Sequence, residues 1–179
     1  MRPEVNRLRK NVYDFIHKRI FAGETDAPVL EIGPMQERWT PVKDYYVNTR
    51  EYFRSSGIEY IACDSDAESG CELLCDVLSL PSHVEQHKIG TIIALEVLEH
   101  VSEVWRTPEI FDYLLKPAGR LYLSVPYYFY RHAPFPDYWR ISEDGLRLLF
   151  SPKFEIEIDA LVTDDERKPL HYTVVGRKK

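Results

Sequence analysis

The sequence predicts one α/β domain: a doubly wound sheet of five parallel strands that ends in an antiparallel β-hairpin. Five short runs rich in Ile, Val, Leu and Tyr alternate with helix-like segments along a chain of 179 residues, a length that fits one domain. The runs show little alternation of apolar and polar residues, which is typical of strands covered by helices on both faces. Near the end of the chain, two strand-like segments follow each other without a helix, and such strands are antiparallel neighbours.

The strands are predicted from the apolar runs themselves, which cover residues 28–32, 58–63, 72–75, 90–95 and 119–125. Residues 154–158 then alternate apolar and acidic side chains with a period of two, and residues 172–175 form a further apolar run. Together these two segments predict the terminal hairpin over residues 153–177.

Start and stop signals place helices between the strands. Thr107, Pro108 and Glu109 supply a cap, a first-turn proline and an acid in the order that begins a helix. Ser142 begins another helix, which ends before Pro152.

Residues 1–23 have apolar side chains at helical spacing and predict an amphipathic helix. Two interpretations of its basic side chains stay open. They form either a solvated face of the helix or a lid or docking face for an anionic substrate. The basic residues are Arg7, Arg9, Lys10, Lys18 and Arg19.

Composition excludes several classes of function. The net charge of −6 argues against general nucleic-acid binding, and no apolar run approaches the roughly 20 residues that span a bilayer. The first residues do not have the pattern of a secretory signal, so we expect a cytoplasmic protein. Three cysteines within thirteen residues (Cys63, Cys71 and Cys75) are expected to be reduced thiols in or near a core. No partner pair at ligand spacing follows them, so we expect no metal site there.

Acidic residues follow the first three predicted strands. The strand from Val29 to Ile32 contains Glu31 and ends at Gly33, which lets the backbone approach a ligand closely. Asp64 ends the second strand, where an acid can accept both hydroxyls of a ribose, and Asp76 ends the third. Ligands of doubly wound sheets bind at the carboxyl ends of the strands, so these residues predict a ligand site there.

These segments resemble the class I S-adenosylmethionine-dependent methyltransferases over roughly residues 28 to 150. Their first three motifs are matched by VLEIGP, YIACDSD and CDVLSLP, and the later segments by IIALEVLEHV and LLKPAGRLYLSVP. The resemblance implies a seven-stranded, Rossmann-like sheet in the order 3-2-1-4-5-7-6, with the seventh strand antiparallel. It also implies that residues 28–150 form the cofactor-binding core of a single domain over residues 1–179.

The resemblance implies positions for S-adenosylmethionine. Glu31 and Gly33 would lie near its methionine moiety, Asp64 would hold the ribose, Asp76 would face the adenine, and Glu96 would edge the pocket. The neighbouring residues Pro34, Ser65 and Val77 are expected to contact the cofactor as well. The chain departs from the family after Gly33, where Pro34 stands in place of the usual further glycines.

The segment over residues 125–140 has an unusual composition, with seven aromatic residues and three prolines among sixteen. It resembles a subgroup of small class I enzymes with a His-x-x-Pro-x-Pro-Asp-Tyr-Trp-Arg signature. A lid packed on the core and a substrate wall both fit this composition. As a substrate wall, it would present Tyr127, Tyr128, Tyr138, Trp139 and Arg140.

His132 is the first candidate for the general base and Asp137 the second. Asp137 and Arg140 could instead pair with each other to fold the loop. His100, in the pair Glu99-His100, is interpreted as a helix-start or supporting residue.

The sequence therefore predicts methyl transfer from S-adenosylmethionine to a small molecule, such as the hydroxyl of a sugar or secondary metabolite. Two alternatives stay open: a non-catalytic binding module with the same fold, and a nicotinamide-dependent oxidoreductase. The second needs a glycine-rich fingerprint that Gly33-Pro34-Met35 does not supply. Protein or nucleic-acid substrates are disfavoured by the net charge.

Overall fold

The computed structural model describes residues 3–23, 25–36, 43–162, 165 and 167–179. Seven strands form one sheet in the order β3-β2-β1-β4-β5-β7-β6, which confirms the predicted order. The first five strands pair in parallel, and β7 runs antiparallel to both of its neighbours. The strands are β1 (Val29–Ile32), β2 (Tyr60–Asp64), β3 (Leu73–Leu74), β4 (Ile89–Leu95), β5 (Leu115–Pro126), β6 (Phe154–Val162) and β7 (Pro169–Lys178).

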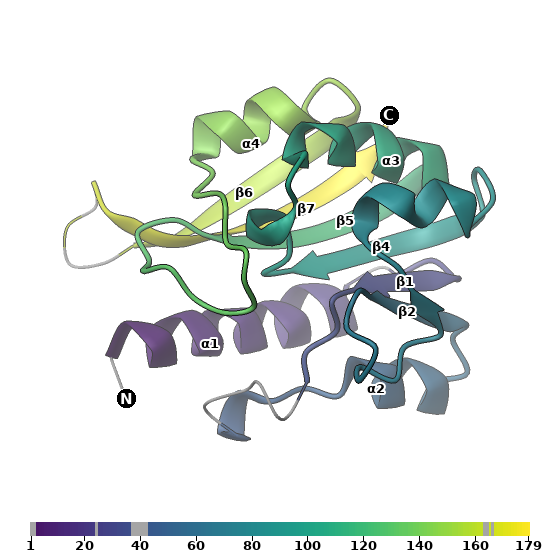
Figure 1. Cartoon of the computed structure of the whole chain (residues 1–179), viewed down its shortest axis with the longest axis horizontal. Helices are drawn as coiled ribbons and strands as arrows, with labels where there is room; N and C mark the ends of the chain where they lie inside the picture. Colours follow the sequence, from purple (N-terminus) through teal and green to yellow (C-terminus); the bar gives the residue numbers. More distant parts are fainter. Residues whose placement is uncertain (1–2, 24, 37–42, 163–164, 166) are drawn as a thin grey trace.

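Helices cover both faces of this sheet, as Figure 1 shows. On one face lie α1 (Pro3–Phe15), its π-helical continuation η1 (Ile16–Phe21) and α2 (Thr49–Ser55). On the other lie α3 (Thr107–Leu114) and α4 (Glu143–Phe150). Each face has its own core of buried apolar side chains. Short helical turns complete the fold: η3 (Lys43–Tyr45), η4 (Val77–Ser82), η5 (Leu98–His100) and η6 (Val104–Arg106).

The predicted strands have somewhat different bounds in the structure, and the third and fifth show why. The third is only two residues long, Leu73–Leu74, because it pairs only with the end of β2. The fifth begins at Leu115, four residues before the predicted start at residue 119. Leu115 pairs with Ile89 of β4, and a register shift between Ile89 and Thr91 accommodates the irregular segment that follows.

The N-terminal segment is an integral helix of the domain. Leu8, Val12 and Ile16 are almost fully buried against the sheet. Of its basic side chains, Arg19 pairs with Glu157 and Asp159 of β6. The helix therefore covers the sheet with its apolar side chains. No described helix is both long and apolar enough to cross a membrane.

The three cysteines are free thiols, as expected. Cys63 is buried at the end of β2, and its Sγ lies 3.4 Å from Sγ of Cys75.

Candidate active site

A cavity of about 290 Å³ lies at the carboxyl ends of β1, β2 and β4. Its volume is at the lower end of the range for small-molecule sites. The predicted cofactor residues Gly33, Asp64, Ser65, Asp76 and Val77 line it. Apolar side chains of Ile32, Leu78, Val97 and Val101 form much of the remaining wall. The structure therefore brings together most of the residues that the sequence assigned to a cofactor.

Gly33 lies where β1 ends and the cavity begins. Its backbone has a φ of +62°, a conformation that favours glycine. A Cβ added at this position would lie 2.9 Å from Cγ2 of Val97, which lines the same cavity. Its backbone N–H donates to the carbonyl oxygen of Cys63 at 2.8 Å, which ties the turn to β2. The backbone at Gly33 thus still lies close to Val97 and to the cavity, although Pro34 follows in place of a further glycine.

The two strand-end acids are held in place by local hydrogen bonds. Oδ1 of Asp64 accepts from the backbone N–H of Asp66 at 2.9 Å, and Oδ2 accepts from Gln36 at 3.2 Å. Asp76 caps η4, since its Oδ1 accepts from the backbone N–H groups of Leu78 and Ser79. Both carboxylates are therefore fixed at the cavity wall while serving as local caps.

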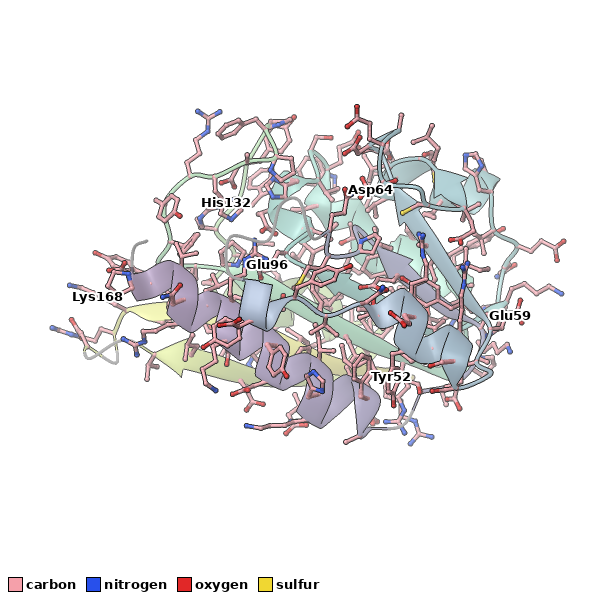
Figure 2. All side chains as sticks on the ribbon, turned by 90° about the horizontal axis from the view of Figure 1, so that it is seen from below. Tyr52, Glu59, Asp64, Glu96, His132 and Lys168 are labelled. Atoms are coloured by element: carbon pink, nitrogen blue, oxygen red, sulfur yellow. The ribbon has the colours of Figure 1, made fainter. Side chains whose placement is uncertain are left out.

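Figure 2 shows Asp64 and His132 toward the same side of the molecule, whereas Glu59, at the opposite end of β2, lies away from them. A second depression, of about 730 Å³, lies at that opposite end of the sheet and is lined by Glu59, Lys88 and Lys116. It is wider, but it lies at the amino ends of the strands. The carboxyl ends are where ligands bind in such sheets, so we assign the site to the smaller cavity.

Glu31 does not line the cavity. Its side chain points into the core on the α1 and α2 face, where it accepts hydrogen bonds from the hydroxyls of Thr49 and Tyr60. Burial raises the pKa of this carboxyl above its usual value. The structure thus places Glu31 apart from the other predicted cofactor residues, because on a strand the side chain next to Ile32 faces the other side of the sheet.

Glu96 follows β4 and also lies outside the lining of the cavity. Its Oε1 accepts from Oγ of Ser124 at 2.9 Å and lies 2.6 Å from Nε2 of His171. Burial acts to raise its pKa, but the charge and hydrogen bond of His171 hold that pKa below its usual value. Nδ1 of His171 lies 3.0 Å from Nδ2 of Asn11 in α1. Glu96 therefore ties β4 to β5 and β7, and it is not among the residues that line the cavity.

Asp137 and Arg140 form a two-pronged ion pair within the aromatic segment. Arg140 donates to the two carboxylate oxygens of Asp137 at 2.5 and 2.7 Å, and to the carbonyls of Phe129, Tyr130 and Trp139. Burial acts to raise the pKa of Asp137, but the hydrogen bonds from Arg140 hold it at about 2. Asp137 is therefore a weak base. The N–H groups of the Arg140 guanidinium donate to acceptors within the loop itself. Of the two interpretations left open, the structure shows the pair that folds the loop.

The aromatic side chains of this segment have separate places. Tyr138 lines the cavity. Trp139 packs against the core, and its indole N–H donates to the carbonyl of Val101 at 2.8 Å. Tyr127 packs near Tyr172, and Tyr128 is exposed with Nζ of Lys168 5.6 Å from its ring centre. Among the five predicted substrate residues, only Tyr138 contributes to the cavity wall.

A cluster of Glu99, His100 and His132 lies beside the cavity, which His100 itself helps to line. Oε1 of Glu99 lies 3.7 Å from Nε2 of His100 and 3.9 Å from Nε2 of His132. The loop is fastened over this cluster, because the backbone N–H groups of Tyr138 and Trp139 donate to the carbonyl of Glu99. In Figure 1 the loop over residues 127–142 lies at the end of the sheet toward which β4 points.

Glu99 was not assigned a role from the sequence. Its side chain is 1% exposed, and neither carboxylate oxygen has a hydrogen-bond partner among the described residues. Burial and the neighbouring Glu96 raise the pKa of Glu99 well above its usual value. Burial lowers the pKa of His132 below its usual value, which favours the neutral imidazole. The available signal was the spacing of Glu96, Glu99 and His100 directly after a buried strand.

Comparison with solved structures identifies the fold. A SAM-dependent methyltransferase from Archaeoglobus fulgidus matches with a TM-score of 0.66 at 13% identity, over 95% of this chain and 94% of that chain. A SAM-dependent methyltransferase from Thermotoga maritima gives a TM-score of 0.65 at 12% identity, over 96% of this chain and 92% of that chain. The chain has the Rossmann-like methyltransferase fold.

This methyltransferase fold also matches a third structure, that of Burkholderia thailandensis 1,6-didemethyltoxoflavin-N1-methyltransferase with bound 1,6-didemethyltoxoflavin and S-adenosylhomocysteine. The TM-score is 0.62 at 16% identity, over 96% of this chain and 78% of that chain. No family model and no curated protein sequence matches the chain.

Proposed function

We propose that this protein binds S-adenosylmethionine in the cavity at the carboxyl ends of β1, β2 and β4 and transfers its methyl group to a small molecule. The observation that carries the proposal is that Asp64, Asp76 and Gly33 all line one cavity. The fold shared with SAM-dependent methyltransferases supports it.

The residues of the cavity fit the parts of this cofactor. A carboxylate accepts two hydroxyl hydrogen bonds, so Asp64 would hold the ribose diol. The apolar side chains of Ile32, Val77 and Leu78 make a slot suited to a flat purine, with Asp76 at its edge. Gly33 has no Cβ, so the space next to Val97 stays open for a ligand to approach the backbone. We place the methionine end here, along Gly33 and Pro34.

We propose a hydroxyl of a small molecule as the acceptor. Tyr138 and His100 at the cavity wall, with His132 behind them, offer an acceptor site beside the cofactor. The cofactor supplies an activated methyl group, and the acceptor oxygen forms its new C–O bond as the C–S bond breaks. The hydroxyl proton must then leave. The neutral imidazole of His132 could accept it, as the sequence suggested. The net charge of −6 disfavours a nucleic-acid substrate, and we propose no nucleic-acid or membrane partner.

Isothermal titration calorimetry with S-adenosylhomocysteine tests the cofactor assignment. We expect saturable binding to the wild-type protein. Asp64→Ala should weaken that binding by about 10- to 100-fold, because it removes charge-assisted hydrogen bonds worth about 1.5–3 kcal/mol. Glu59→Ala is the matched control, since this exposed acid precedes the same strand at its other end. Its affinity should equal that of the wild type.

The absence of any heat of binding for the wild type would contradict the cofactor assignment. Equal affinities of Asp64→Ala and Glu59→Ala would show that Asp64 does not bind the ribose. Displacement of S-adenosylhomocysteine by NADH would instead favour the oxidoreductase alternative. Saturable binding without methyl release from labelled cofactor, over a broad set of hydroxylated acceptors, would favour a binding module.

A further inference from the structure

The buried carboxylate of Glu99 is the least satisfied polar group among the described residues. Both of its oxygens and Nδ1 of His132 are buried without a hydrogen-bond partner. A carboxylate removed from water is costly unless a cation or hydrogen-bond donors compensate for the lost hydration. Nε2 of His100 and Nε2 of His132 face it from two sides at 3.7 and 3.9 Å. The two imidazole nitrogens thus lie near the carboxylate but too far away to form hydrogen bonds with it.

We propose that Glu99, His100 and His132 bind a divalent transition-metal ion at the edge of the cofactor cavity. Their ligand atoms all lie within 4.8 Å of one another. Bonds from such an ion to nitrogen and oxygen are about 2.0–2.2 Å long, so adjacent ligand atoms stand about 3–3.5 Å apart. Shifts of a few tenths of an ångström would bring the carboxylate to this range from each imidazole, and the two imidazoles would have to approach each other by up to about 1.3 Å.

The surroundings of the cluster already orient the imidazole of His100 as a metal ligand. Nδ1 of His100 lies 3.0 Å from the carbonyl oxygen of Pro136. A carbonyl only accepts, so Nδ1 carries the proton and Nε2 presents its lone pair toward Glu99. A carbonyl partner of this kind commonly holds a metal-binding histidine in position. Nδ1 of His132 has no such partner, because Oδ2 of Asp137 lies 3.8 Å away, beyond hydrogen-bond distance.

The ligand set selects the kind of ion. Two imidazoles and one carboxylate suit Zn²⁺, Mn²⁺ or Fe²⁺, whereas Mg²⁺ and Ca²⁺ prefer oxygen ligands alone. Three protein ligands leave at least one coordination position for water or a substrate oxygen, which is the pattern of catalytic sites. His100 lines the cavity, so that the open position lies next to it.

The role of the ion rests on the proposed function. The hydroxyl oxygen of the acceptor would take the open position, where the positive charge lowers the pKa of the hydroxyl. The O–H bond then breaks at neutral pH, its electron pair stays on the bound oxygen, and the proton leaves to solvent water. In this arrangement His132 is a ligand, and no free general base is needed.

Titration of the metal-free protein with Zn²⁺, and separately with Mn²⁺, tests the site. Calorimetry should show one ion bound per chain of the wild type, and Co²⁺ should give the visible absorption bands of a histidine-ligated ion. Glu99→Gln and His132→Asn should each weaken Zn²⁺ binding by at least about 100-fold, more than the loss of a supporting residue costs. The control is His83→Ala, which removes an exposed histidine from the other end of the sheet. It should bind as the wild type does. Circular dichroism of each variant checks its folding, and His132→Asn serves if Glu99→Gln fails to fold.

Three results would overturn the proposal: no stoichiometric binding of either ion, affinities of the ligand variants equal to that of His83→Ala, or methyl transfer that is unaffected by chelation. S-adenosylhomocysteine binding, measured in the same samples, separates the two proposals. Metal binding without it would leave the metal site standing and remove the methyltransferase function. Binding of S-adenosylhomocysteine without metal would do the reverse, and His132 would return to the role of base.

Discussion

Gly33 combines two constraints that act on a single residue. Its φ of +62° disfavours any residue with a side chain, and its place against Val97 leaves no room for a Cβ. The second constraint belongs to the cavity, because Val97 is β-branched, cannot turn away cheaply, and lines the same space. The glycine is therefore required both by the backbone and by the ligand that we propose.

Gly33→Ala should weaken S-adenosylhomocysteine binding by at least about tenfold, which corresponds to about 1.4 kcal/mol. The control is Gly70→Ala. Gly70 has a similar φ of +67°, but a Cβ there would meet no atom within 4 Å. Both variants should lose about 1–2 kcal/mol of unfolding free energy from backbone strain. Calorimetry and urea denaturation measure the two effects separately. Equal losses of affinity would show that strain alone, rather than the close approach, governs binding.

The sequence predicted the positions of some acidic residues correctly and of others not. Asp64 and Asp76 line the cavity as predicted, since they follow strands whose ends meet at one edge of the sheet. Glu31 lies within its strand, and the period of two turns it to the opposite face. Glu99 had only its spacing from Glu96 and His100 as a local signal, because its burial depends on the loop that covers it.

At the scale of elements, the loop over residues 127–142 is the least regular part of the described fold. It has few internal backbone hydrogen bonds, and side-chain contacts take their place. Arg140 alone connects the carbonyls of Phe129, Tyr130 and Trp139 to the carboxylate of Asp137. The loop also supplies His132 to the cluster. Its folding therefore decides the geometry of the acceptor side.

Asp137→Asn should loosen this loop. The variant loses charge-assisted hydrogen bonds worth about 1.5–3 kcal/mol and leaves the guanidinium without its counter-charge. Trypsin should then cleave after the exposed Arg131 at least about tenfold faster than in the wild type, at 1.4 kcal/mol per factor of ten. Glu143→Gln, which affects the exposed pair with Arg147 in α4, is the control and should leave the rate unchanged. An unchanged rate in Asp137→Asn would mean that apolar packing alone holds the loop.

At the scale of the whole molecule, the N-terminal helix closes one of the two cores. Its buried side chains meet residues of β1, β4, β5 and β7, which are distant in the sequence. Asn11 and Arg19 add polar contacts to β7 and β6. The helix thus joins the parallel half of the sheet to the antiparallel hairpin. Its loss would expose the face on which both halves pack.

Leu8→Ala should lower the unfolding free energy by about 2–5 kcal/mol, because the side chain is 2% exposed and leaves a cavity in the core. Lys10→Ala on the same helix removes only an exposed pair with Asp14, and should cost less than about 0.5 kcal/mol. Urea denaturation followed by circular dichroism compares the two. Similar, small effects for both variants would indicate that the segment behaves as a separable lid.

The sequence by itself determined the order of the elements, the strand order through the family resemblance, and the edge of the sheet at which Gly33, Asp64 and Asp76 meet. These features follow from local patterns, since apolar periodicity and strand-end residues act within a few neighbouring positions. Only the tertiary structure decided how distant charged groups are paired. It joins Glu96 to His171 and pairs Arg140 with Asp137 of the same loop. It also brings His132 close to Glu99 and His100. The physical reason is that hydrogen bonding and the cost of burial depend on which groups the fold brings into contact, and a sequence pattern does not contain those distances.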